Sequence, residues 1–100
     1  MQVKNRVKEI LKIVQQLSPG NSVELRIPPY AAIQCVTGSV HRRGTPPNVV
    51  EMSGDTLLEL VGNPTYWDEF CHAGRISASG TNSNLKDLFA QVSKLNSGSK

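Results

Sequence analysis

The sequence predicts an α+β domain in which helices pack on one face of a mostly antiparallel sheet of about five short strands. Helical periodicity marks both ends of the chain, and several segments between them alternate apolar with polar residues and are broken by prolines and glycines. Strands and helices do not alternate regularly, which argues against a parallel βαβ sheet. One hundred residues suit one domain, so we expect a single domain over residues 1–95 and a frayed polar tail over residues 96–100.

The first helix is predicted over residues 3–17. Apolar residues recur there at three- and four-residue steps and give the helix one apolar face, while Lys4, Lys8 and Lys12 fall on another face. A Pro-Gly pair then ends the helix. The apolar face has no Trp or Phe, so a packed helix with a solvated basic side is favoured over a helix that lies on a membrane surface.

Three strands are predicted in the middle of the chain. Residues 23–27 alternate as a half-buried strand that Pro28-Pro29 stops, because proline cannot donate to a strand ladder. Residues 30–37 form a second, more buried strand. Residues 38–47 contain two glycines and two prolines and are expected to form a loop or short hairpin. A short strand over residues 49–52 follows.

Two helices are predicted next. Asp55 is expected to cap the first, since its carboxylate can accept amide hydrogens of the first turn, and Gly62 is expected to end it. Thr65 is expected to cap a second, shorter helix, with Asp68 three residues later completing a capping box. Gly74 ends this helix.

A strand and a helix complete the domain. Residues 75–79 alternate as a strand with Ile76 and Ala78 directed inward. The last helix begins at about Asn84 and carries one apolar stripe.

Composition excludes several classes of protein. The net charge is +3 with a pI near 9.1, but apart from residues 41–43 the basic residues are scattered rather than gathered as in most nucleic-acid binders. No apolar run resembles a signal peptide or a membrane span, so the cytoplasm is the expected location. The two cysteines are too few for a disulfide scaffold.

No catalytic or metal site is predicted. Cys35, His41, Cys71 and His72 lack the paired spacing of zinc ligands, and adjacent residues of a helix point about 100° apart. The carboxylates form no obvious acid–base pair, and no glycine loop of the phosphate-binding type occurs. We therefore expect a protein without cofactor or metal that is not an enzyme.

The order of features across residues 48–80 resembles the C-terminal half of the sterol carrier protein-2 (SCP2) domain. In that family a strand leads to a helix with an acidic start and a leucine pair. A glycine, a short helix with a bulky apolar residue, a second glycine and a strand closed by glycine follow. The residues that match this order are Asp55, Leu57, Leu58, Gly62, Trp67, Gly74, Arg75, Ile76 and Gly80. The stretches PPYAAIQC and HRRGTPPNVVE also resemble short SCP2-like proteins of actinobacteria.

The resemblance implies a five-stranded sheet backed by helices, with an apolar tunnel between the layers that binds sterols, fatty acids or acyl-CoA. The stretch before residue 48 is shorter than in the family, so we expect a smaller cavity. Apolar side chains of the helices could line it, or could simply fill the core of so small a domain. The candidates are Leu58, Val61, Trp67, Phe70, Leu88, Phe89 and Val92.

The polar end of a ligand has its own candidates. His41, Arg42 and Arg43 lie together between two glycines, and guanidinium groups bind phosphate or carboxylate through paired hydrogen bonds. The alternative is a solvated loop, or pairing of the arginines with Glu51 or Asp55.

We expect non-catalytic binding of a hydrophobic or amphipathic small molecule, as a carrier of a lipid, fatty acid or sterol-like ligand. The alternative is a protein–protein interaction or homodimerisation domain that uses the apolar groove. Nucleic-acid binding through the basic helix and loop is a weaker third alternative. Transient membrane contact is compatible with the first function, and a homodimer with either of the first two.

Overall fold

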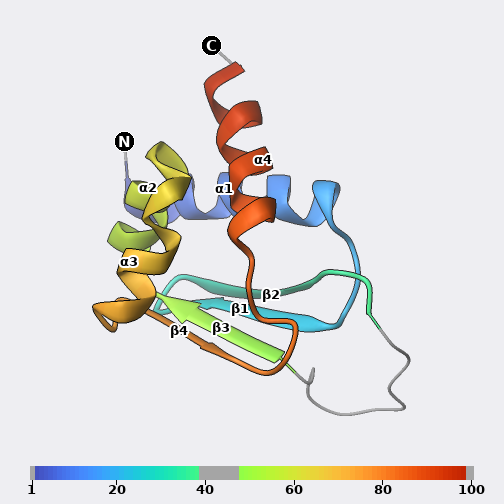
Figure 1. Cartoon of the computed structure of the whole chain (residues 1–100). Helices are drawn as coiled ribbons and strands as arrows, with labels where there is room; N and C mark the ends of the chain where they lie inside the picture. The colour runs from blue at the N-terminus through green and yellow to red at the C-terminus, as the bar shows by residue number, and fades with distance from the viewer. Residues whose placement is uncertain (1, 39–47, 99–100) are drawn as a thin grey trace.

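A computed structural model describes residues 2–38 and 48–98, with side chains up to residue 96 (Figure 1). The helices are α1 (Val3–Leu17), α2 (Gly54–Gly62), α3 (Trp67–His72) and α4 (Lys86–Gly98), with a 3₁₀ turn, η1 (Pro64–Tyr66), between α2 and α3. The strands are β1 (Val23–Ile27), β2 (Ala31–Cys35), β3 (Asn48–Met52) and β4 (Ile76–Ser79). This set confirms the α+β class.

The four described strands form one mixed sheet in the order β2-β1-β3-β4. β1 pairs with β2, and β3 with β4, in antiparallel fashion, whereas β1 and β3 run parallel with Leu25 opposite Val50. Within residues 2–38 and 48–98, the expected five strands are thus corrected to four. The parallel pair at the centre was not predicted, because it joins strands that lie far apart in the sequence.

β2 is an edge strand, and the prediction of a longer, more buried strand over residues 30–37 is wrong. The strand covers five residues, in which Ala32 and Gln34 are exposed, Ile33 is half-buried and Cys35 is fully buried. The reason is its position: β2 has a neighbouring strand on one side only, and the described helices cover only one of its faces.

All four helices lie on one face of the sheet, as the sequence predicts (Figure 1). The opposite face is polar. There Arg26 Nε lies 3.6 Å from Glu24 Oε2, and Arg26 Nη1 lies 3.7 Å from Glu51 Oε1. These residues alternate with the buried Leu25 and Val50, which gives the half-buried pattern of an antiparallel sheet with one solvated face.

The core fills the layer between the helices and the sheet. α1 packs against α2, α4 and β2. Ala78 lies on the inner face, opposite Val50, but is exposed because β4 forms the other edge, whereas Ile76 is buried. The largest fully buried side chains are Phe89, Ile10, Leu25, Ile27, Leu57, Leu60, Val7, Val14, Val23, Val50, Val92 and Cys35.

The caps of the middle helices differ from the prediction. Ser53, not Asp55, caps α2, since Ser53 Oγ accepts a hydrogen bond from the Thr56 amide at 3.1 Å. Asp55 lies in the first turn, where its charge complements the helix dipole. Thr65 does not cap α3 either. Its amide and hydroxyl both donate to Asn63 Oδ1, which thereby caps the preceding 3₁₀ turn.

Asp68 has no part in a capping box. Its carboxylate instead accepts a hydrogen bond from Lys86 Nζ at 2.9 Å, which joins α3 to the start of α4. The sequence prediction failed here because a capping-box spacing also occurs where the acidic residue points to another helix.

α4 begins at Lys86, two residues after the predicted start near Asn84, and Asn84 Oδ1 accepts from the Lys86 amide at 3.0 Å. The helix runs to Gly98, so the polar tail expected from residue 96 begins inside it. The domain boundary at residue 95 stays a prediction.

Candidate functional site

The apolar candidates for ligand contact all belong to the core between the helices and the sheet. Val61, Trp67, Phe70, Phe89 and Val92 are each at most 4% exposed, and Leu58 and Leu88 are partly buried against them. The Trp67 and Phe89 rings stack with their centroids 6.2 Å apart. These side chains therefore already contact one another and the rest of the core.

Leu88 differs from the other six candidates because it also lines a hollow at the surface. This hollow, which we call the α1–α4 groove, has a volume of about 440 Å³, within the range of about 300–1,000 Å³ typical of small-molecule sites. It opens where the end of α1, the end of β2 and the start of α4 meet. Its lining residues are Ser18, Val36, Thr37, Thr81, Asn82, Asn84, Leu85 and Leu88.

The groove has a polar rim and an apolar side. Leu85 is 3% exposed and part of the core, while Leu88 packs against the core from the groove. The polar members of the lining are neutral hydroxyl and amide residues. The groove thus places neutral hydrogen-bonding groups beside two leucines, Leu85 in the core and Leu88 packed against it.

Backbone hydrogen bonds fix the β2 side of the groove. The Val36 amide donates to the Ser18 carbonyl at 2.8 Å, and the Val36 carbonyl accepts from the Ser22 amide at 3.0 Å. These bonds hold Val36 at φ = 69°, which is unusual for a β-branched residue. Thr37 Oγ1 donates to the Pro19 carbonyl at 2.9 Å and fastens the adjacent rim.

A buried asparagine fixes the other side of the groove. Asn48 is 2% exposed; its side-chain amide donates to the Ser22 carbonyl at 2.9 Å, and its Oδ1 accepts from the Asn82 amide at 2.9 Å. Asn48 therefore ties the start of β1 to the turn that precedes α4.

The head-group candidates His41, Arg42 and Arg43 lie outside the described residues. Both described ends of the chain around them are at the groove: Gly38 follows the lining residue Thr37, and Asn48 binds the lining residue Asn82. The role of the three residues stays a prediction.

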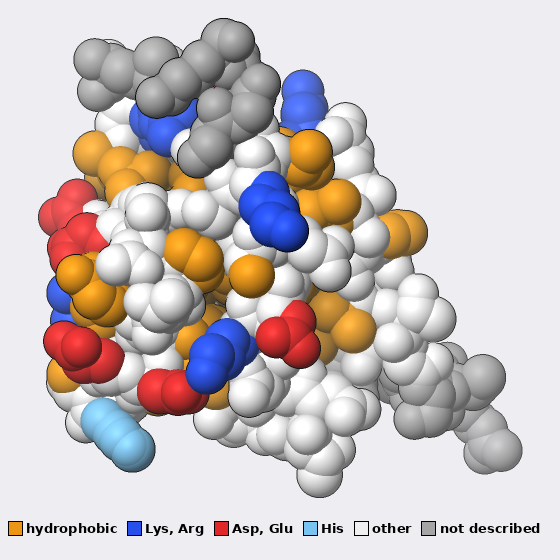
Figure 2. All heavy atoms as spheres, turned by 45° about the horizontal axis from the view of Figure 1, so that its top comes forward, with side chains coloured by type: hydrophobic (Ala, Val, Ile, Leu, Met, Phe, Trp, Pro, Cys, Tyr) orange, Lys and Arg blue, Asp and Glu red, His pale blue; other side chains and the backbone are white. Residues whose placement is uncertain are grey.

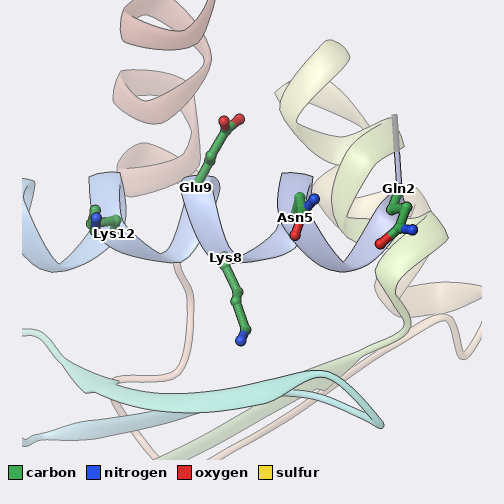
Figure 3. A pocket seen from close by; sticks show the side chains of 5 residues that line it. All are labelled: Gln2, Asn5, Lys8, Glu9 and Lys12. Carbon is green, nitrogen blue, oxygen red and sulfur yellow. The ribbon is translucent and has the colours of Figure 1, made fainter.

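A second hollow, of about 670 Å³, lies along α1 and is less suited to an apolar ligand. Gln2, Asn5, Lys8, Glu9 and Lys12 line it. In Figure 3, Lys8 points toward the sheet and Glu9 away from it. All five lining residues are polar or charged, so apolar contact in this hollow comes only from the aliphatic stems of these side chains.

The thiols do not favour nucleophilic or metal chemistry. Burial raises the pKa of Cys35 to about 11, and burial, with a smaller effect of Asp68, raises the pKa of Cys71. Both thiols are therefore protonated at neutral pH, whereas the thiolate is the reactive and metal-binding form. No cluster of three or more metal-ligating side chains occurs within residues 2–38 and 48–96.

Among the described residues, side chains of both charges are mixed over the helices. Figure 2 shows acidic, basic and hydrophobic side chains interspersed on this face. This distribution does not resemble the basic stripe of a nucleic-acid-binding surface.

Sequence reasoning missed most of the groove. Thr37, Thr81 and Asn82 carry no motif, and they come together only because the ends of α1, β2 and β4 meet the start of α4.

Among the described helices, none is long and apolar enough to span a membrane.

Comparison with known proteins agrees with the architecture. No curated protein matches the chain. A family model described as bacterial SCP ortholog matches residues 1–90. The match covers nearly the whole described fold, including the groove, and confirms the SCP2-like resemblance of the sequence. The chain therefore belongs to the family of bacterial SCP orthologs.

Proposed function

We propose that the chain is a non-catalytic binding module for a hydrophobic or amphipathic small molecule, which enters at the α1–α4 groove. Membership of the SCP family supports a sterol-carrier-like role. The observation that carries the proposal is the double position of Leu88, which lines the groove and packs against the core.

The filled interior limits how a ligand binds. Trp67, Phe70, Phe89 and Val92 leave their mutual contacts only if an incoming chain displaces them, which costs packing energy. Each methylene removed from water contributes about 0.8 kcal/mol in return. We therefore propose that the apolar chain first contacts Leu88 and Leu85, and that longer chains reach the buried cluster by moving its side chains.

Arg42 and Arg43, with His41, are the proposed contacts of an anionic head group. Their segment joins the described chain at Thr37-Gly38 and at Asn48, beside the groove. Binding alone needs no catalytic group, so we propose a carrier rather than an enzyme, and the cytoplasmic location stays a prediction.

The test uses Trp67 fluorescence during titration with a long-chain fatty acid and with the alcohol of the same length. Leu88→Gln should weaken binding of both probes about ten- to a hundredfold, since a leucine contact contributes about 1.5–3 kcal/mol. Leu95→Gln is the matched control, because Leu95 lies on the same helix, is 50% exposed and does not line the groove.

The same titration tests the arginines. Arg42→Ala combined with Arg43→Ala should weaken binding of the fatty acid but not of the alcohol. Wild-type protein that binds neither probe and carries no lipid in native mass spectrometry would contradict the proposed function. Equal binding of the acid by wild type and double variant would contradict the head-group assignment alone.

A further inference from the structure

Within the described residues, the outer edge of β2 has few of the features that usually prevent strands from pairing with other chains. β2 is at one end of the described sheet, and its sequence AAIQC contains no charged residue and no proline. Natural edge strands are usually protected by charges, prolines, bulges or covering elements. An uncharged edge of five residues is therefore a candidate for pairing with a further strand.

The backbone of β2 shows which groups face outward. Gln15 on α1 donates its side-chain amide to the Gln34 carbonyl at 3.4 Å, on the side away from β1. In an antiparallel pair the N–H and C=O groups of one residue point to the same side, and residues two apart share that side. Ala32 and Gln34 thus present their backbone groups to the outer edge.

The apolar layer beneath the helices is also incomplete at this edge. Ala31 and Ile33 face the core but are only partly buried, whereas their β1 partners Ile27 and Leu25 are 0% exposed. The opposite edge differs, because β4 has four residues, its inward Ile76 is already 3% exposed and its other inward residue, the exposed Ala78, is small. A strand added beside β2 would cover more apolar surface than one added beside β4.

The residues of β2 complement a second copy of themselves. When two β2 strands run antiparallel with Ile33 at the two-fold axis, Ala32 of each copy lies opposite Gln34 of the other. The outward backbone groups then pair in both directions, with the Gln34 carbonyl exchanging its 3.4 Å hydrogen bond from Gln15 for one from the second copy, and Ile33 meets its own counterpart. No like charges meet across this pairing, which would otherwise oppose it.

We propose that two copies of the chain associate through antiparallel pairing of their β2 edges, which joins their sheets into one continuous sheet. Two short strands bury less than the roughly 1,200 Å² typical of stable interfaces. The dimer is therefore a concentration-dependent equilibrium rather than a permanent assembly. This proposal is independent of ligand binding at the α1–α4 groove.

Sedimentation equilibrium of the whole chain, from low micromolar to millimolar concentration, tests the dimer. The average mass should rise from 10.9 kDa toward twice that value. Ala32→Lys combined with Gln34→Lys places like charges opposite one another across the pair and should shift the midpoint concentration upward at least tenfold. Ser77→Lys combined with Ser79→Lys is the matched control, since it adds the same charge to the exposed side of β4.

A charge-reversal experiment separates pairing from misfolding. The variant with Ala32→Glu and Gln34→Glu should also be monomeric alone, but mixing it with the lysine variant should restore a heterodimer. Circular dichroism of each variant checks that it folds. A monomer at every concentration would overturn the proposal. A dimer that the β2 variants leave unchanged, or that the β4 variants weaken equally, would also overturn it.

Discussion

The two ends of the layer between helices and sheet are held by different chemistry. At the α3 end, Arg75 binds both carboxylate oxygens of Glu59, at 3.2 and 2.7 Å, and its guanidinium carbon lies 4.2 Å from the centre of the Phe70 ring. At the α1–α4 groove, neutral hydroxyl, amide and backbone groups surround a hollow of about 440 Å³. A charged pair, which we call the clamp, thus joins α2 to the start of β4 at one end, and neutral groups surround the hollow beside Leu88 at the other.

This difference suggests why a ligand would enter at the groove. Opening the α3 end would separate Arg75 from Glu59 and from Thr56, to which Arg75 Nε donates at 3.2 Å. Under the proposed function, entry at the groove begins with a change in the position of Leu88, which is partly exposed. The Arg75 contacts at the α3 end would then stay in place while an apolar chain binds at the groove.

The largest expected effect comes from Phe89→Ala. Phe89 is 0% exposed and stacks on Trp67, so its loss leaves a cavity and should lower the free energy of unfolding by about 3–5 kcal/mol. Leu88→Ala, one residue earlier at the groove, should cost clearly less because Leu88 is only partly buried. Urea denaturation of both variants measures the difference. Equal losses would show that the groove is as tightly packed as the core.

A smaller effect is expected from Asn48→Ala. The change leaves the buried Ser22 carbonyl and the Asn82 amide without their partner, which should cost about 1–3 kcal/mol in the free energy of unfolding. Because Asn48 fixes the turn before α4, the variant should also bind the fatty alcohol more weakly than wild type. Ser79→Ala, on the exposed face of β4, is the control. Unchanged stability would mean that this network does not hold the groove.

The sequence predicted the elements whose signals are local. β1 ends at Pro28-Pro29 as expected, and α1 covers the predicted residues 3–17. The α2 cap was misplaced because Ser53 and Asp55, two residues apart, both have suitable side chains, and only the backbone geometry selects Ser53. N-cap preference in the sequence does not decide between Ser53 and Asp55, because both residue types are favoured at this position.

Features that join distant parts of the chain could not be predicted from local sequence patterns. The parallel pairing of β1 with β3 depends on strands more than twenty residues apart. The groove combines residues near 18, 36, 82 and 88, none of which carries a motif. In contrast, the amphipathic stripe that places Phe89 and Val92 in the core is visible in the sequence, since helical period alone determines which side of α4 is buried.

The smallest expected effect, from Arg75→Gln, tests the clamp at the α3 end through its pH dependence. The hydrogen bonds that Arg75 donates to Glu59 hold the pKa of Glu59 below its usual value and raise the pKa of Arg75. A lowered carboxyl pKa stabilises the folded state above the pKa of the unfolded chain, and this stabilisation is lost as pH falls through the folded-state pKa. Both groups are near the surface, so solvent screens the interaction and the effect is modest.

Arg75→Gln should therefore lower the free energy of unfolding at neutral pH, and the difference in this free energy between variant and wild type should shrink under strongly acidic conditions. Urea denaturation at pH 7 and at a pH below the carboxyl titration, compared with Arg6→Gln at the exposed Arg6–Glu9 pair, measures this. A difference from wild type that stays constant with pH would assign the role of Arg75 to its contact with the Phe70 ring rather than to Glu59.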